Sequence, residues 1–269
     1  MKAKKHLGQH FLHSDKVLTQ IIDAAEPDAS DIILEIGPGK GVLTRKLVFF
    51  AGKVIAVEKD TELIPILRET FEPEIAAGKL DLIEQDILDF DPEILRFYKD
   101  FTYKLVANIP YYITGLILRK FLEAAYQPAQ MVLLVQREVA ERVVARDGKE
   151  SLLSLSIKAY GDPSIAARVP RGAFVPPPTV ESAILVIEGI SKKNFQSKDE
   201  EELFFQVIRA AFAHKRKVAL KNLAGYFNID DITAFWETEK IDVRARAEDI
   251  HLDVWLKLTH MLYTASNDS

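Results

Sequence analysis

IILEIGPGKG, residues 32–41, is the stretch that decides the fold. Its first half is an apolar run that predicts a buried strand, and the apolar residues after Gly41 are spaced as in a helix over 41–50. A glycine-rich turn between a strand and a helix is where a doubly wound α/β fold binds a nucleotide-like ligand, because glycine lets the ligand approach the backbone. We therefore predict an α/β fold with Gly37 and Gly39 at a ligand site.

Short apolar runs alternate with stretches of helical periodicity along most of the chain. Besides 32–36, strands are expected at 54–58, 80–85, 104–107, 131–135 and 182–187. Helices are expected at 60–71, 114–126 and 138–146, and after Ser14, a favourable N-cap for apolar residues spaced through Ile22. This alternation is typical of a parallel sheet covered by helices.

The length and composition indicate a larger and a smaller globular domain, with 269 residues of which 48% are hydrophobic and 28% charged. The polar stretch GISKKNFQSK at 189–198 has the composition of a linker. From residue 199 onward the apolar residues have helical spacing only. We predict a sheet-containing domain over 1–188 and an all-helical domain over 189–269.

Composition also excludes several classes of site. The absence of cysteine excludes disulfide scaffolds, thiolate zinc sites and cysteine nucleophiles, and no metal is expected. No apolar run reaches the length of a signal-peptide core near the N-terminus or the ~20 residues of a membrane span. We expect a cytoplasmic protein with no membrane partner.

The net charge of −5 disfavours a nucleic-acid partner unless basic residues are concentrated locally, because phosphate contacts supply much of the affinity. Two runs, 1–13 and 214–222, contain several basic residues and histidines and no acidic residue. Each run is either a solvated helix face or a phosphate contact, and the sequence leaves both open.

Two carboxylates stand near the ends of the next expected strands. Glu58 lies 21 residues after Gly37 and can accept hydrogen bonds from both hydroxyls of a ribose. Asp86 follows the third expected strand, where it can accept from the amine of an adenine. The same arrangement suits S-adenosyl-L-methionine and NAD, so this spacing leaves the cofactor open.

The loop after the fourth expected strand is Asn108-Ile109-Pro110-Tyr111. An aromatic amine is a poor nucleophile because its lone pair is delocalised, and acceptors for its two hydrogens favour a pyramidal nitrogen. The side-chain oxygen of Asn108 and the backbone carbonyl of Ile109 are suited to that task. Pro110 stiffens the turn and Tyr111 offers a stacking face. An ordinary turn is the alternative, since Asn and Pro both favour turns.

With these motifs the chain resembles the ribosomal RNA adenine dimethyltransferases of the KsgA/RsmA type. The similarity covers nearly the whole length, with motifs in the same order at 6–12, 35–41, 108–111, 136–139, 174–182 and 211–217. It implies a Rossmann-like class I methyltransferase domain, a small C-terminal helical domain and S-adenosyl-L-methionine as methyl donor. It also implies N6-dimethylation of two adjacent adenosines in a 3′-terminal hairpin loop of small-subunit (16S) ribosomal RNA. The implied partner is the immature small ribosomal subunit, and the implied role is in its biogenesis.

The resemblance also assigns site residues. The positions that match Gln9, His10 and Leu12 fold over the methionine end of the cofactor, and others that complete its site are Gly37, Glu58, Asp86 and Asn108. Phe174 is expected to close the target-base pocket opposite Tyr111, and the prolines at 176–178 stiffen the chain beside its ring. His10 stands where asparagine is expected, so a backbone contact is expected from it. Tyr112 also replaces an asparagine.

Three alternatives remain open. An Erm-type enzyme would methylate large-subunit ribosomal RNA, although 174–178 and 212–217 look more like the small-subunit group. An NAD-dependent oxidoreductase would use the glycine turn and Glu58, but the sequence has no catalytic His or Lys in an obvious place. A ribosome assembly factor would keep the cofactor site without catalysis.

Overall fold

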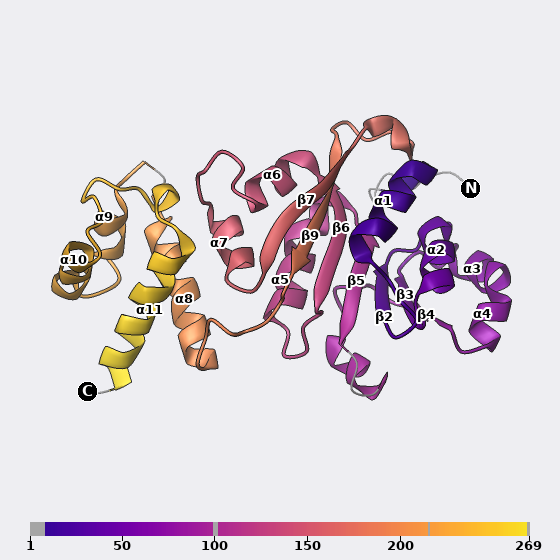
Figure 1. Cartoon of the computed structure of the whole chain (residues 1–269), viewed down its shortest axis with the longest axis horizontal. Helices are drawn as coiled ribbons and strands as arrows, with labels where there is room; N and C mark the ends of the chain where they lie inside the picture. The colour runs from indigo at the N-terminus through magenta and orange to yellow at the C-terminus, as the bar shows by residue number, and fades with distance from the viewer. Residues whose placement is uncertain (1–8, 99–101, 215, 268–269) are drawn as a thin grey trace. The chain divides into compact units, whose positions relative to one another are not determined.

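The computed structural model describes residues 9–98, 102–214 and 216–267, which form two compact units (Figure 1). One unit comprises Met1–Ala140 and Asp162–Ile190, and the other comprises Glu141–Gly161 and Ser191–Ser269. Residues 141–161 were expected in the sheet-containing domain, whereas their contacts group them with the helical unit. The reason is helix α7 (Leu152–Lys158), whose Leu155 is buried in the helical core together with Phe204.

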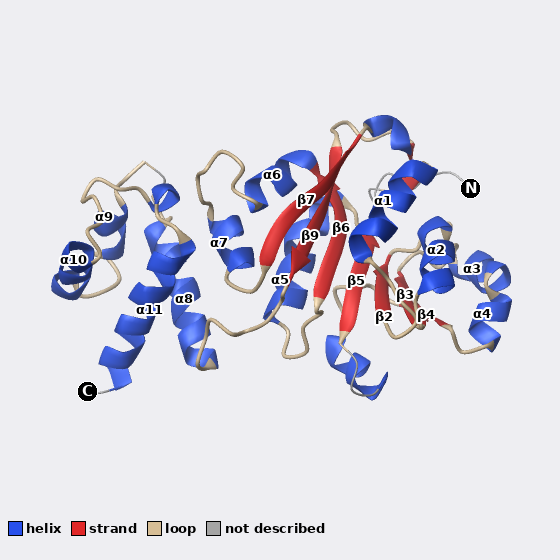
Figure 2. Ribbon diagram, viewed as in Figure 1, coloured by secondary structure: helices blue, strands red, loops and turns tan. Residues whose placement is uncertain are grey.

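The first unit is built on a seven-stranded sheet, which confirms the α/β fold (Figure 2). Its strands, in spatial order, are β4 (Leu80–Glu84), β3 (Lys53–Glu58), β2 (Ile32–Ile36), β5 (Tyr103–Asn108), β6 (Gln130–Gln136), β9 (Ser182–Glu188) and β7 (Asp162–Val169). The first five are parallel, whereas β9 runs antiparallel to both β6 and β7. The sheet is therefore parallel over its first five strands, as the alternation predicted, and mixed at this edge. The segment 170–181 that connects β7 to β9 contains no α-helix, whereas a crossover between parallel strands usually contains one.

Strand β7 was not predicted from the sequence, because it lies at the edge of the sheet. It is the last strand of the sheet, and most of its residues are exposed or half-buried. Its sequence, DPSIAARV, therefore lacks the apolar run that marked the central strands. A sequence pattern that detects burial finds the middle of a sheet more readily than its edge.

Helices cover the sheet on both faces. The helices α1 (Asp15–Ala25), α2 (Val42–Phe50) and α3 (Ile64–Thr70) share one hydrophobic cluster with the strands, and α4 (Glu72–Ala76) packs beside β4. Figure 2 shows α1 in front of the strands and α5 (Thr114–Glu123) behind them. Further short elements are α6 (Arg137–Val143), η2 (Pro92–Tyr98), η3 (Tyr111–Ile113) and η4 (Arg171–Ala173).

Two residues fix where these helices begin. Ser14 is the N-cap of α1, as predicted, although its side chain makes no capping hydrogen bond. Gly41 is the N-cap of α2 with a φ of +77°, and a Cβ there would lie 2.5 Å from Cε2 of Phe71. Glycine is therefore required at 41 both by the backbone conformation and by the close packing of α2 on the end of α3.

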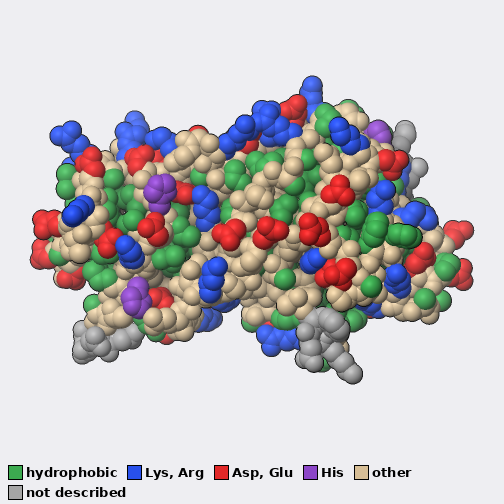
Figure 3. Space-filling model, in the orientation of Figure 1, with side chains coloured by type: hydrophobic (Ala, Val, Ile, Leu, Met, Phe, Trp, Pro, Cys, Tyr) green, Lys and Arg blue, Asp and Glu red, His purple; other side chains and the backbone are tan. Residues whose placement is uncertain are grey.

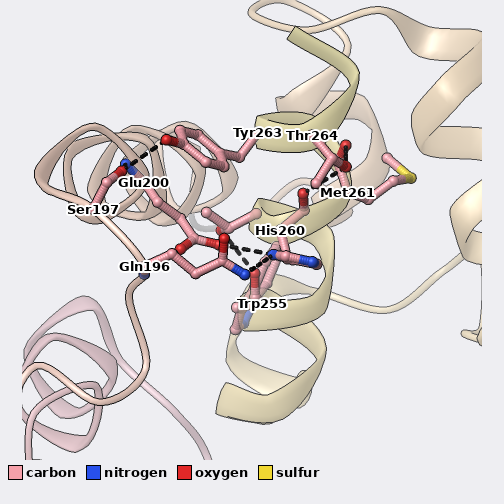
Figure 4. A network of polar contacts seen from close by, with 9 residues as sticks. Gln196, Ser197, Glu200, Trp255, His260, Met261, Tyr263 and Thr264 are labelled. Carbon is pink, nitrogen blue, oxygen red and sulfur yellow. Dashed lines mark hydrogen bonds and ion pairs between the residues drawn. The ribbon is translucent and has the colours of Figure 1, made fainter. Parts of the chain in front are cut away.

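The second unit is all-helical, with α8 (Lys198–Ala211), α9 (Ala219–Leu223), α10 (Ile229–Thr238), η5 (Ala247–Asp249) and α11 (Leu252–Asn267) following α7. Its core contains Trp236 and Trp255, with ring centroids 6.3 Å apart in an edge arrangement. A polar network also ties α11 to the start of α8 (Figure 4). In it, Nδ1 of His260 lies 3.0 Å from Oε1 of the buried Glu200.

The described parts of the chain lack two features. No helix there is both long enough and apolar enough to cross a membrane. Within the same residues, no three His, Asp or Glu side chains gather as a metal site would require.

Candidate functional site

A cavity opens beside the carboxyl ends of β2, β3, β4 and β5. The spatial order of the strands reverses between β2 and β5, which is the switch point where open α/β sheets bind ligands. All but one of the site residues expected from the sequence line this cavity, namely Gln9, His10, Leu12, Gly37, Gly39, Glu58, Asp86, Asn108, Ile109, Pro110 and Tyr111. The exception is Phe174.

The glycine turn after β2 is tied to the end of β3. The backbone N–H of Gly37 donates to the carbonyl of Val57 at 2.9 Å, and the N–H of Gly39 donates to Oε2 of Glu58 at 3.0 Å. Gly37 has a φ of +64°, and among the described residues, its own chain neighbours aside, no atom lies within 4 Å of where its Cβ would be. The glycine therefore meets a backbone requirement and leaves open space on the cavity side of the turn.

Glu58 ends β3 as a buried carboxylate, with 6% of its surface exposed. Its Oε1 accepts from the N–H of Asp60 at 2.8 Å, and burial raises its pKa although the backbone donors of Asp60 and Gly39 oppose that rise. A carboxylate oxygen accepts more than one hydrogen bond. The two oxygens are thus fixed in place and can still accept from two hydroxyls of a ligand.

Glu35 also lines the cavity, and the sequence analysis gave it no role. Its side chain is 1% exposed and its Oε2 has no hydrogen-bond partner among the described residues. Burial raises the pKa of Glu35 to about 8, and the negative charge of Glu58 adds to that rise. The signal in the sequence was a charged residue inside an otherwise apolar strand, which is expensive unless the residue serves a ligand or a partner.

Asp86 lies just beyond β4 and is held on both oxygens. Oδ2 pairs with Nζ of Lys59 at 2.6 Å, and Oδ1 accepts from the N–H of Leu88 at 3.0 Å. Partial burial favours the protonated form, but Lys59 and the Leu88 N–H outweigh it and hold the pKa of Asp86 below its usual value. An adenine amine at this carboxylate would share it with Lys59.

The loop after β5 is joined to the N-terminal segment. Nδ2 of Asn108 donates to the backbone carbonyl of His10 at 3.1 Å. This bond orients the amide and leaves its oxygen as the acceptor, and no described residue donates to that oxygen. Gln9 is likewise anchored, since its Nε2 donates to Oδ2 of Asp60 at 2.8 Å.

Tyr111 is fixed at both ends of its side chain. Its hydroxyl lies 2.6 Å from Oγ of Ser182 at the start of β9, and burial raises its pKa. Its ring stacks near the His10 ring, with centroids 6.0 Å apart and planes 22° apart. His10 in turn reaches the carbonyl of Pro176 through Nδ1 at 2.8 Å. The wall near the loop is therefore assembled from segments far apart in the sequence.

Phe174 is the expected site residue that does not line the cavity. It lies in β8 (Phe174–Val175), which pairs antiparallel with β1 (Phe11–Leu12) so that Leu12 faces Phe174. The ring is 2% exposed, belongs to the hydrophobic core of the unit and does not line the cavity. The ring is covered by core neighbours in this structure, and its expected role opposite Tyr111 in a base pocket stays a prediction.

The two basic runs are described only in part. Residues 1–8 and Lys215 lie outside the described residues. Arg216, Lys217 and Lys221 of the second run are exposed. On the face seen in Figure 3, basic and acidic side chains are interspersed, with basic ones gathered along the upper edge. The choice between a solvated face and a phosphate contact stays a prediction.

The chain is similar to known proteins along most of its length. The family described as Ribosomal RNA adenine dimethylase matches residues 1–263. The Ribosomal RNA small subunit methyltransferase A of Dehalococcoides mccartyi is 45% identical over 260 residues, which cover 96% of this chain and 88% of that one. The protein of the same name from Clostridioides difficile is 35% identical over 271 residues, with 98% and 92% covered.

Solved structures agree with the fold. A dimethyladenosine transferase from Plasmodium falciparum superposes with a TM-score of 0.80 at 26% identity, covering 96% of this chain and 98% of that one. The 23S rRNA methyltransferase ErmE superposes with a TM-score of 0.77 at 24% identity, covering 94% and 99%. The second likeness concerns the fold alone, whereas the relatives at higher sequence identity bear the name of a small-subunit enzyme.

Proposed function

Because the chain belongs to the ribosomal RNA adenine dimethylase family, we propose that it transfers methyl groups from S-adenosyl-L-methionine to N6 of adenosines in small-subunit (16S) ribosomal RNA. The family and the methyl donor expected from the sequence motifs are thereby confirmed, and an NAD-dependent oxidoreductase is excluded. The observation that carries the proposal is the position of Asn108. Its oriented amide stands at the end of β5, in the same cavity as the carboxylates that end β2 and β3.

The cavity fits the methyl donor by the chemistry of its lining. The buried carboxylate of Glu58 suits the ribose hydroxyls, Asp86 suits the adenine amine, and the open space at Gly37 admits the ligand against the backbone. The unpartnered oxygen of the buried Glu35 carboxyl group can accept a hydrogen bond from a donor group of the ligand. When bound, S-adenosyl-L-methionine supplies an electrophilic methyl group on its sulfonium.

The chain's own contribution is to hold the amine. In the first transfer, the amide oxygen of Asn108 and the carbonyl of Ile109 accept the two hydrogens of the amine, which directs the nitrogen lone pair outward. The methylated nitrogen then loses one proton to water, so that a single hydrogen is left for these acceptors in the second transfer. The hydrogen bond from Asn108 to His10 keeps that oxygen oriented, and the bond from Tyr111 to Ser182 keeps the phenol ring in place. Catalysis then rests on positioning and preorganised acceptors. The target adenosine must be unpaired or flipped, since a helix hides its amine.

The substrate particle and the place of action extend the same proposal. We infer two adjacent adenosines in a 3′-terminal hairpin loop as the target and the immature small subunit in the cytoplasm as the partner. The relatives named for the small subunit support this choice over the Erm-type alternative.

The test is to incubate the protein with undermodified small ribosomal subunits and labelled methyl donor, and to map the product by mass spectrometry. Two neighbouring dimethyladenosines are expected. Methylation confined to large-subunit RNA would support the Erm-type alternative. Tight binding of the particle and of S-adenosyl-L-methionine without methylation would indicate an assembly factor.

A further inference from the structure

The aromatic side chains near the loop differ in how much freedom they have. Tyr111 is held by Ser182 and by the His10 ring, and Phe174 is buried in the core. Tyr112 lines the same cavity but is 64% exposed. Among the described residues, it takes part in no hydrogen bond and no ring contact. A ring that contributes little to the core is available to a partner.

The exposed apolar surface continues along the helix that follows. Leu116 lies four residues after Tyr112 and is 53% exposed, so the two occupy successive turns on one side of η3 and α5. Between them, Ile113 is buried. The outward side of this segment therefore carries an apolar strip that begins at the cavity and leads away from it.

The chemistry of this strip fits an unstacked nucleic-acid base. The proposed reaction extrudes an adenine toward Asn108, which removes the base on which its neighbour in the RNA was stacked. An unstacked base exposes an apolar face and binds aromatic side chains with little dependence on its identity. Tyr112 lines the cavity that contains Asn108 and is exposed to solvent, so it can receive a base that stays outside the cavity while the target adenine enters it.

We propose that Tyr112, extended by Leu116, is the stacking platform for the nucleobase adjacent to the target adenine. This inference rests on the proposed function, because it takes RNA as the substrate. In this proposal Tyr112, not Phe174, stacks on a base. The base that reacts lies at Asn108, and the base that stacks on Tyr112 is its neighbour in the RNA.

The first experiment measures methylation kinetics of Tyr112→Ala, Tyr112→Phe and Tyr112→Leu on undermodified small subunits. Alanine should raise KM for the particle about 5- to 150-fold, the range that base–aromatic stacking corresponds to. Phenylalanine should stay close to the parent, and leucine, which lacks a π face, should fall between. The affinity for S-adenosyl-L-methionine and the melting temperature should change little. Phe49→Ala is the matched control, since Phe49 is 75% exposed in the same unit and does not line the cavity.

A second measurement identifies the base. Particles that carry an abasic nucleotide next to the mapped adenosine, on either side in turn, are methylated by the parent and by Tyr112→Ala. On the side of the stacked base, the abasic particle should raise KM of the parent by the same factor as the substitution Tyr112→Ala does. Combining the abasic particle with Tyr112→Ala should raise KM no further. Additive losses on both sides, or an unchanged KM in Tyr112→Ala, would overturn the inference.

The same experiment separates this inference from the proposed function. If the parent methylates large-subunit particles instead, the small-subunit assignment fails, and the Tyr112 comparison is made on the substrate that is methylated. If the parent methylates neither particle, the proposed function fails and the inference fails with it.

Discussion

The two sides of the cavity are built by different means. The inner wall, formed by Glu35, Gly37 and Glu58, stands on the ends of adjacent parallel strands, and its contacts run between neighbouring strand ends. The outer wall, formed by His10, Asn108, Tyr111 and Tyr112, is held by bonds between segments 71 to 166 residues apart. The arrangement of the parallel strands therefore determines the inner wall. The outer wall depends instead on contacts between the N-terminal segment and loops that are distant in the sequence.

The two walls also differ in what they bury. The inner wall buries the carboxyl groups of Glu35 and Glu58, and burial raises the pKa of each. The outer wall leaves an aromatic ring at its rim in solvent. This difference suggests that substitutions in the inner wall act on the cofactor, and substitutions in the outer wall act on the RNA base and on the shape of the site.

The largest effect should come from Phe174→Ala, which removes the support behind the outer wall. Replacing a buried phenylalanine by alanine typically lowers the unfolding free energy by about 3–5 kcal/mol. Urea denaturation of the parent and the variant would measure this loss. Val175→Ala is the control, because Val175 is 59% exposed and the effect should stay within about 0.5 kcal/mol. If Phe174→Ala keeps its stability and loses only methylation, the ring contacts the base after all.

Asn108→Ala tests the acceptor that the outer wall orients. The turnover number should fall about 10²–10³-fold, the usual effect of removing one preorganised group at a reacting centre. Single-turnover kinetics with saturating methyl donor measure the chemical step, and calorimetry on the same variant should show a smaller change in cofactor affinity. A variant that turns over at the parent's rate would remove Asn108 from the mechanism.

Glu58→Ala tests the inner wall. Loss of charge-assisted hydrogen bonds to the ribose should weaken S-adenosyl-L-methionine binding by about 1.5–3 kcal/mol, or roughly 10- to 150-fold. Glu84 is the matched control, since it pairs with Glu58 in register on β4, is exposed and does not line the cavity. Equal dissociation constants for Glu58→Ala and Glu84→Ala, measured by calorimetry, would contradict the assignment.

The smallest effect concerns the proton on Glu35. Burial raises its pKa from 4.5 to about 8, so between these values the folded chain keeps a proton that the unfolded chain releases. The proton on Glu35 therefore contributes its full stabilisation of the folded chain below pH 4.5. As the pH rises from 4.5 toward about 8, the unfolding free energy falls by up to roughly 1.4 kcal/mol per pH unit. Glu35→Gln should lack this slope.

The measurement is the unfolding free energy of parent and Glu35→Gln at about pH 6 and about pH 7. The difference between the two proteins should shift by up to about 1.4 kcal/mol in favour of the glutamine variant at the higher pH. Glu84→Gln, at an exposed position, should follow the parent. Identical slopes for all three proteins would mean that Glu35 is ionised in the folded chain.

Most of the inner wall could be predicted from the sequence. An apolar run marks a buried strand, a glycine turn marks its exit, and parallel strands bring Gly37, Glu58 and Asp86 to one edge of the sheet without further information. Glu35 was visible in the same motif, but its burial depends on what packs around β2, so its raised pKa could not be predicted.

Only the tertiary structure decided the outer wall. The sequence predicted neither β1 nor β8, because strands of two residues have no periodicity to detect. Their pairing places Phe174 in the core, although its motif had suggested a base pocket. The sequence by itself determined the family, the cofactor edge and the loop Asn108–Tyr111, since local patterns encode them. Which aromatic ring is buried and which is exposed at the cavity depends on contacts between distant segments, and such contacts exist only in the folded chain.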